Sequence, residues 1–343
     1  MKKNIRKVLI FSSIIVLIAF FIIIVFIKST SKGLDTYISL RLNINSMLNP
    51  NSIDNKSIKE VRKTLDTETT RWSKPSIPFS NIKNFTIVTN SNKVPVRIYT
   101  PGNASNIPIV IYSHSGSWAA GNLDTEDNVC RKLSRNTNAI VISVNYRLAP
   151  ENPFPSGLTD VYDVLQWTYK NAKSINGDEK RIAVVGASSG GNLSAAASLM
   201  SRDKNGPPIV CEVLIYPSTN IFKLNSESWS HFSKNINIPI NDMERYVSLY
   251  VPKKEDRKNS YASPLLAEDF SRLPDTLIVT AQVDPLRDEG NAYGEKLKNA
   301  GVKVKLSQYT GVSHGFITMD KITKKADKAL DDVALYLQKE FHK

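Results

Sequence analysis

Three side-chain types that together form a nucleophilic catalyst occur along the chain in the order Ser188, Asp284 and His314. A serine hydroxyl is a weak nucleophile until a neighbouring base removes its proton. Histidine can take that proton near neutral pH, and a carboxylate can orient the imidazole and stabilise its protonated form. The three residues therefore predict acyl transfer through a covalent intermediate on Ser188.

The serine is the central residue of a Gly-x-Ser-x-Gly sequence at 186–190. An apolar strand is predicted over 182–185 directly before it, and a helix of small residues over 192–200 after it. A nucleophile elbow requires this strand–turn–helix context, with glycines that let strand and helix approach closely. Taken alone, the motif also fits a phosphate-binding turn or a Ser/Gly-rich connector.

The positions of the other two residues favour the elbow. Asp284 follows a predicted strand at 277–280, and His314 follows one at 302–308. Open α/β sheets bind ligands at the carboxyl ends of their strands, so the three side chains are expected to meet there. Asp288 is the rival carboxylate, but Asp284 lies closer to the strand end.

Eight short apolar or β-branched runs predict the strands that position these residues. Helical patterns separate most of the runs, which favours an α/β, doubly wound fold with a mainly parallel sheet and helices on both faces. The predicted strands lie at 85–88, 94–99, 107–112, 139–144, 181–185, 210–216, 276–280 and 302–308.

Six longer stretches carry a family resemblance: HSGSW at 114–118, NYRLAPENPFP at 145–155, GASSGGNLS at 186–194, YASPLLAEDFSRLP at 261–274, VDPLRDEGNAYGEKLKNAG at 283–301 and SHGF at 313–316. Through them, residues 85–340 resemble the hormone-sensitive-lipase-like esterases, which include the arylacetamide deacetylases. The resemblance implies an α/β-hydrolase fold with a mostly parallel eight-stranded sheet, helices on both faces and a helical cap. Ser188, Asp284 and His314 match the family's triad, whose chain order is Ser–Asp–His.

The resemblance also implies an oxyanion hole, formed by backbone N–H groups of Gly116, Ser117 and Ser189. This chain departs from the usual HGGG loop, because serines stand at 115 and 117. Backbone donors keep their chemistry if the local conformation suits a non-glycine residue. A positive φ at Ser117 would strain it by about 1–3 kcal/mol, and a lost donor lowers kcat by about 10²–10³-fold.

A helical cap is expected over the active site, formed by residues 34–72 and 217–259. The first segment has amphipathic helical spacing, and the second lacks a strand pattern although it lies between two predicted core strands. Trp118, Phe222 and Trp229 are the predicted substrate contacts. Ordinary cap packing is the alternative for Phe222 and Trp229.

Residues 8–27 are apolar and uncharged, and 20 residues at about 1.5 Å each span the roughly 30 Å hydrocarbon core as a helix. A cleaved signal peptide is the alternative, but the run is long and no Ala-x-Ala site follows it. Four cations precede it and two follow. The positive-inside rule therefore predicts a single-pass membrane protein with a cytoplasmic N-terminus and an extracytoplasmic catalytic domain. The predicted domains are the tail and anchor, 1–32, and the hydrolase domain, 33–343.

Composition excludes several other classes of protein. The 343 residues carry a net charge of +13, but six cations and no acids lie in the first 32 residues. The remaining 39 basic residues exceed the 32 acidic ones by only seven, with no basic patch among aromatics, so nucleic-acid binding is not predicted. Two cysteines rule out a disulfide scaffold and a cysteine zinc cluster. The resemblance implies neither a metal nor an organic cofactor.

The predicted function is a carboxylic-ester hydrolase, a serine esterase or lipase-like enzyme. It is expected to act through an acyl-enzyme on short- to medium-chain acyl or acetyl esters, so its partner is a small-molecule ester. An amidase or deacetylase stays open, because the same triad cleaves either bond. A non-catalytic ligand-binding member of the fold is the remaining alternative, which the presence of His314 disfavours. The oligomeric state also stays open, a homodimer included.

Overall fold

The computed structural model describes residue 13 and residues 33–48, 53, 56–89, 92–102, 105–233 and 238–343. The predicted membrane anchor at 8–27 lies outside these residues, apart from Ser13. Among the residues that are described, no helix is both long and apolar enough to cross a membrane.

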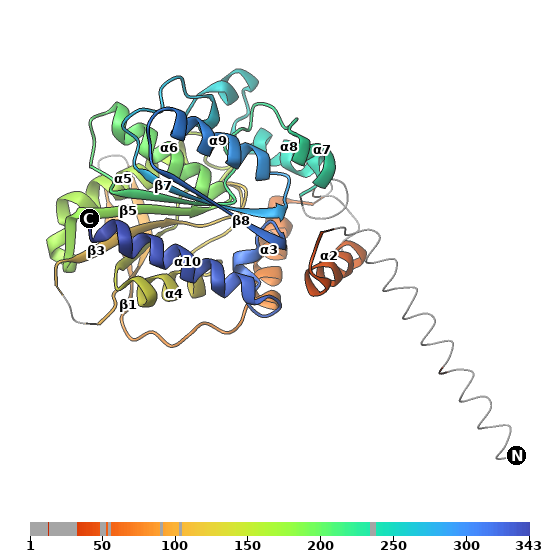
Figure 1. The fold of residues 1–343 in the computed structure, drawn as a ribbon, viewed down its shortest axis with the longest axis horizontal. Helices are drawn as coiled ribbons and strands as arrows, with labels where there is room; N and C mark the ends of the chain where they lie inside the picture. The colour runs from red at the N-terminus through yellow and green to blue at the C-terminus, as the bar shows by residue number, and fades with distance from the viewer. Residues whose placement is uncertain are drawn as a thin grey trace, which may run out of the picture.

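A β-sheet forms the centre of the fold (Figure 1). Its eight strands are in the order β1-β2-β4-β3-β5-β6-β7-β8. The pairs β1/β2 and β2/β4 are antiparallel and the other five pairs are parallel, which confirms the predicted mostly parallel sheet. The strands are β1 (Ile82–Val88), β2 (Lys93–Tyr99), β3 (Ile107–Ser113), β4 (Ile140–Val144), β5 (Gly177–Ala187), β6 (Cys211–Ile215), β7 (Asp275–Val283) and β8 (Val304–Ser313).

The last strands run further than predicted, and this extension positions the site. β7 continues to Val283 and β8 to Ser313, and these two residues are register partners. Polar residues near the end of β8 hid this extension in the sequence, because the prediction relied on apolar runs. Asp284 and His314 each follow directly after the end of their strand, side by side at one edge of the sheet.

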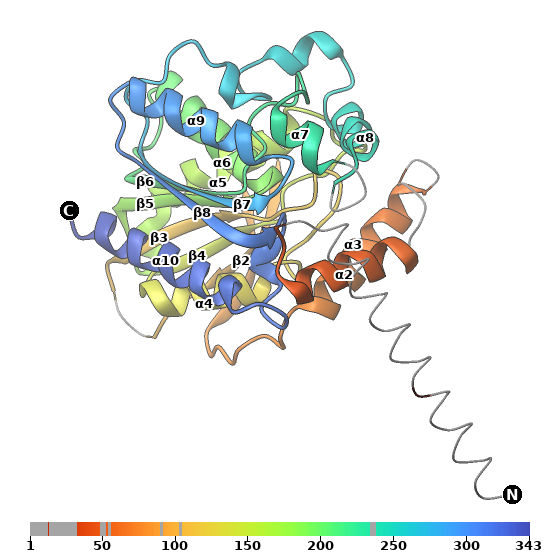
Figure 2. The same cartoon turned by 45° about the vertical axis from the view of Figure 1, so that its right-hand side comes forward.

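Both faces of the sheet are covered by helices (Figures 1 and 2). Alternate residues of β3 pack into the hydrophobic cores on the two faces of the sheet. Ile109 and Ile111 belong to the core under α5 and α6, whereas Val110 and Tyr112 belong to the core under α4 and α10. The covering helices are α4 (Asp127–Thr137), α5 (Ser156–Asn171), α6 (Ser189–Asp203), α9 (Arg287–Asn299) and α10 (Lys324–Phe341).

Both of the segments predicted as cap elements contain helices. The first contains α2 (Thr36–Leu48) and α3 (Ile58–Trp72), which lie together at the edge of the molecule in Figure 2. The second contains α7 (Glu227–Phe232), α8 (Ile240–Tyr250) and the short 3₁₀ helix Lys254–Lys258.

Hydrogen bonds join the two cap segments. The Ile53 amide donates to Asp242 Oδ1 at 3.1 Å, and Arg245 Nη2 donates to the Lys56 carbonyl at 2.7 Å. Asp242 and Arg245 both belong to α8, so the chain around the start of α3 is attached to that helix. The contact brings together two stretches almost 190 residues apart in the sequence.

Candidate active site

Ser188 lies at the sharp turn between β5 and α6, and the turn requires an unusual backbone conformation at this residue. Its φ is +56° and its ψ −117°, a sparsely populated region that costs a non-glycine residue about 1–3 kcal/mol. Added Cβ atoms at Gly186 and Gly190 would stand 2.1 Å and 2.0 Å from backbone oxygens. The two glycines are therefore required for the close approach that forces the turn.

A continuous hydrogen-bonded chain joins the three predicted catalytic side chains. His314 Nε2 lies 2.9 Å from Ser188 Oγ, and His314 Nδ1 lies 2.9 Å from Asp284 Oδ2. Asp284 is fully buried, and its other oxygen accepts the Leu286 amide at 2.9 Å. The carboxylate needs a proton on Nδ1, so that Nε2 carries the lone pair that accepts the serine proton.

The rival carboxylate, Asp288, is engaged elsewhere. It accepts the Ser228 amide at 2.7 Å and the Arg287 guanidinium at 2.8 Å. The ion pair and these hydrogen bonds lower the pKa of Asp288, against the opposing effect of its partial burial. Of the two candidates, the structure therefore places only Asp284 against His314.

The predicted oxyanion loop has an unusual run of positive φ angles. They are +133° at Gly116, +52° at Ser117 and +58° at Trp118. A Cβ at Gly116 would lie 2.1 Å from the Ala120 carbonyl oxygen, so that position requires glycine. Ser117 and Trp118 adopt left-handed conformations that cost L-residues about 1–2 kcal/mol each. The strain expected for Ser117 at positive φ is therefore present.

Side chains of three neighbouring elements hold this loop. Trp118 Nε1 donates to Asn192 Oδ1 on α6 at 3.0 Å, and its ring stacks on Tyr250 with centroids 4.7 Å apart. Tyr146 Oη donates to the His114 carbonyl at 2.9 Å. Burial lowers the pKa of His114 to about 4, so this histidine is neutral near pH 7.

Ser189, the third predicted oxyanion donor, is the first residue of α6. The first N–H groups of a helix have no intrahelical acceptor, and the positive end of the helix dipole lies there. The Ser189 amide is thus available for a developing negative charge beside Ser188. The structure brings this helix start close to the loop, since Asn192 of the same helix holds Trp118.

The three predicted substrate contacts occupy different environments. Trp118 and Trp229 are each 1% exposed. Trp229 Nε1 donates to Glu289 Oε2 at 3.0 Å, which favours the packing alternative for this residue. Phe222 is half-buried, and its ring is flanked by the Lys223 and Lys258 ammonium groups at 5.6 Å and 5.0 Å from its centroid. Substrate contact by these residues stays a prediction.

Sequence reasoning missed Glu126 and Glu289, two buried carboxylates near the site. Glu289 accepts the amides of Thr219 and Asn220 at 2.8 Å and 3.2 Å, and burial raises its pKa to about 7. Its place three residues after Leu286, in the resembling stretch, and its position on α9 were available signals. In the described part of the chain, no group of three or more His, Cys, Asp or Glu side chains is arranged to hold a metal.

Comparison with known proteins agrees with this geometry. A profile of the α/β-hydrolase fold matches residues 110–318. The carboxylesterase NlhH of Mycobacterium tuberculosis is 39% identical over 256 residues, covering 73% of this chain and 79% of that protein. The ethyl acetate hydrolase of Pseudomonas putida is 33% identical over 254 residues, covering 73% and 79%. The structure of a hyperthermophilic esterase from Pyrobaculum calidifontis has a TM-score of 0.80 at 33% identity, covering 83% of this chain and 94% of that one.

The matched region contains Ser188, Asp284 and His314, which are the three residues of the hydrogen-bonded chain described above. Sequence identity above 30% extends over nearly three quarters of the chain. The chain therefore belongs to the α/β-hydrolase family, among its hormone-sensitive-lipase-like esterases, and is a carboxylic-ester hydrolase.

Proposed function

We propose that this ester hydrolase works through an acyl-enzyme on Ser188, with His314 as general base and acid and Asp284 as its orienting carboxylate. The observation that carries the proposal is the hydrogen-bonded chain through the three residues, 2.9 Å at each step. Both distances lie within the reach that proton transfer requires.

In acylation, Ser188 Oγ attacks the ester carbonyl carbon while His314 Nε2 takes the hydroxyl proton. The imidazolium then gives this proton to the leaving alcohol oxygen as the C–O bond breaks. In deacylation, His314 takes a proton from water, whose oxygen attacks the acyl carbon, and returns it to Oγ as the acid leaves. Asp284 accepts the Nδ1–H throughout and stabilises the positive imidazole.

The tetrahedral oxyanion is held by the backbone N–H groups of Gly116, Ser117 and Ser189. The position of Ser189 at the start of α6 and the left-handed loop at Gly116 and Ser117 support this role. Because the donors are backbone groups, the serine side chains do not remove them. Preorganised donors of this kind supply a large part of the rate acceleration in acyl transfer.

The substrates are short- to medium-chain acyl or acetyl esters. The relative named ethyl acetate hydrolase supports a small acyl group. Of the proposed substrate contacts Trp118, Phe222 and Trp229, Phe222 is the most accessible, because the two tryptophans are each 1% exposed. A deacetylase that cleaves amides is the second candidate, because the same triad cleaves either bond and the family that this chain resembles includes the arylacetamide deacetylases. Comparing matched acetyl ester and acetanilide substrates separates the two.

The enzyme is anchored in a membrane by residues 8–27, with a cytoplasmic N-terminus and an extracytoplasmic catalytic domain under a cap made of residues 34–72 and 217–259. The uncharged apolar run and the six flanking cations support this arrangement. Protease added to intact cells would digest the catalytic domain if it faces outward and spare it if it faces the cytoplasm.

Size-exclusion chromatography with light scattering of the detergent-solubilised chain would test for a homodimer.

The test of the proposed function uses the full chain in detergent and a series of 4-nitrophenyl esters from acetyl to palmitoyl. The expected result is rapid hydrolysis of the short and medium esters by the wild type. The matched variant S188A is expected to lose at least about 10⁴-fold in kcat. A folded wild type that hydrolyses no ester faster than S188A would contradict the proposal.

A further inference from the structure

Glu126 is a buried carboxylate that the proposed mechanism does not use. It immediately precedes α4 and is 3% exposed, yet its side chain makes no hydrogen bond that caps this helix. No lysine or arginine within the described ranges forms an ion pair with it. A carboxylate buried without a cation needs hydrogen-bond donors for its oxygens, so its donors indicate what it holds.

Both oxygens of Glu126 are bound by the residue that opens the oxyanion loop. Ser115 Oγ donates to Oε1 at 2.6 Å, and the Ser115 amide donates to Oε2 at 3.3 Å. Tyr112 Oη, from β3, donates to Oε2 at 2.7 Å. The carboxylate thus attaches Ser115, the residue directly before Gly116, to the carboxyl end of β3.

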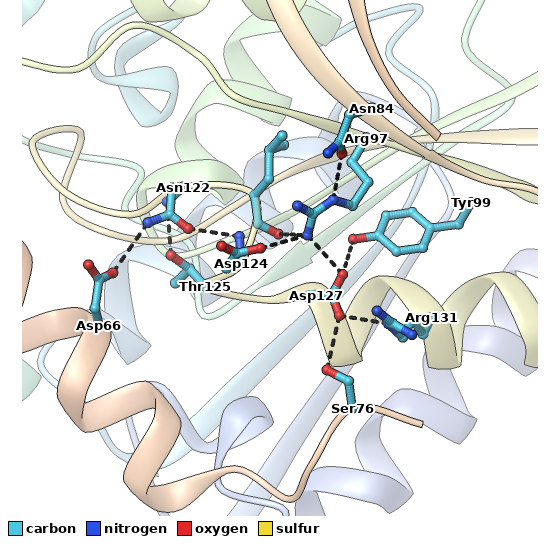
Figure 3. Close-up of polar contacts among 11 residues, drawn as sticks. Asp66, Ser76, Asn84, Arg97, Tyr99, Asn122, Asp124, Thr125, Asp127 and Arg131 are labelled. Carbon is cyan, nitrogen blue, oxygen red and sulfur yellow. Dashed lines mark hydrogen bonds and ion pairs between the residues drawn. The ribbon is translucent and has the colours of Figure 1, made fainter. Parts of the chain in front are cut away.

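The segment that carries Glu126 is itself fixed on both sides (Figure 3). Arg97 of β2 donates to Asp124 at 2.7 Å and to Asp127 at 3.0 Å, and Tyr99 Oη donates to Asp127 at 2.7 Å. Asn122, at the start of the segment, donates to Asp66 of α3 at 3.3 Å. Glu126 therefore projects from a segment held to the sheet and to α3, and is a fixed point for the loop.

The loop needs such a point. Gly116, Ser117 and Trp118 all have positive φ, and strained residues of this kind persist only where their surroundings over-determine them. At one end of the loop, Trp118 is held by its hydrogen bond to Asn192. At the other end, Ser115 is held by its hydrogen bond to Glu126.

We infer that Glu126 is a positioning residue of the oxyanion hole, which acts through Ser115 to hold the N–H groups of Gly116 and Ser117 in place. This inference rests on the proposed function. It also gives a reason for the departure from HGGG at this position. With glycine at 115, the carboxylate would lose the hydroxyl that binds Oε1, and a buried oxygen would be left without its donor.

Burial raises the pKa of Glu126 above its ordinary value, against the opposing effect of the hydrogen bonds from Ser115 and Tyr112.

The test is a double-mutant cycle of S115A and E126Q, assayed with the full chain in detergent on 4-nitrophenyl acetate. Each single variant is expected to lower kcat about tenfold with KM changed less than about twofold, because the donors move rather than the binding surface. The double variant is expected to lose no more than E126Q alone, since the two residues act as a unit. E126A, which removes the side chain, should lose up to about 10²-fold.

E212Q is the matched control, because Glu212 is equally buried but lies on β6, where it accepts from Thr276. Its kcat and KM should equal those of the wild type. Circular dichroism of each variant separates positioning from misfolding. S115A alters only a hydroxyl and keeps the test decisive if E126Q or E126A does not fold.

The inference is wrong if folded S115A and E126Q keep the wild-type kcat, if their losses lie in KM, or if the losses multiply in the double variant. Each of these results with an active wild type leaves the proposed function standing. A folded wild type no faster than S188A overturns the proposed function, and the inference with it. Failure of one is therefore distinguishable from failure of the other.

Discussion

The elbow and the oxyanion loop both hold non-glycine residues at positive φ, but they are stabilised in different ways. The elbow is stabilised by close packing of backbone segments against one another. Glycines at 186 and 190 let β5, α6 and the end of β3 approach to distances that no side chain allows. In the loop, Ser117 and Trp118 are held through the polar and stacking contacts of neighbouring side chains.

This difference shows where each half of the site is vulnerable. The elbow depends on the absence of Cβ atoms at its glycines, because any Cβ there would collide with a carbonyl oxygen. The loop depends on contacts with the side chains of Glu126 and Asn192, which a single substitution removes. Substitutions in the elbow should therefore abolish folding or activity outright, and those in the loop should reduce activity by degrees.

G190A should have the largest effect, because its Cβ would stand 2.0 Å from the Ser113 carbonyl oxygen. The expected result is a loss of about 3 kcal/mol or more in the free energy of unfolding, with esterase activity at background. G290A is the matched control, since its Cβ would meet only ordinary contacts at 3.5 Å. Urea unfolding of both variants measures the difference, and equal stabilities would contradict the account of the elbow.

W118F should have the next largest effect. Phenylalanine can keep the stacking on Tyr250 but leaves Asn192 Oδ1 without the indole donor. An unsatisfied buried acceptor costs about 1–3 kcal/mol, and kcat should fall about tenfold as the loop loosens. Thermal unfolding and ester kinetics check both effects. Unchanged kcat in W118F would mean that this end of the loop is held by its backbone.

S117G and S115G should change stability in opposite directions. Glycine at 117 removes the penalty of the left-handed conformation and is expected to stabilise the fold by about 1 kcal/mol. Ser115 has no such φ, so glycine there only removes the hydrogen bond to Glu126 and should destabilise by about 1–2 kcal/mol. Denaturant midpoints measured side by side test this pair, and a shared sign would contradict it.

E212Q should leave the esterase activity unchanged, and its effect on stability should depend on pH. Burial raises the pKa of Glu212 from 4.5 to about 7. Between these values the folded state binds more protons than the unfolded state, so wild-type stability falls as pH rises. Glutamine does not titrate. The free energy of unfolding of the variant, relative to that of the wild type, should therefore rise by about 1 kcal/mol for each pH unit in that window. Unfolding curves at pH 5, 6 and 7 measure it, and a constant difference would contradict the effect of burial.

The sequence was sufficient for the sheet and the hydrogen-bonded triad, because apolar runs mark buried strands and the three residues follow strand ends. It was also sufficient to expect strain at Ser117, given the glycine that usually stands there. It could not predict the extension of β8 to Ser313, because its added residues pair without forming an apolar run. The attachment of Ser115 by Glu126 was equally hidden, since no local pattern shows which way a carboxylate at a helix start will turn.

The central claim is that Ser188 is the nucleophile activated by His314. The most direct test is to treat the full chain in detergent with a fluorophosphonate and to locate the adduct by mass spectrometry. The account predicts one phosphonyl group per chain, on Ser188, with none in S188A and much slower labelling in H314A. A folded, unlabelled wild type, or an adduct on any other residue, would contradict it.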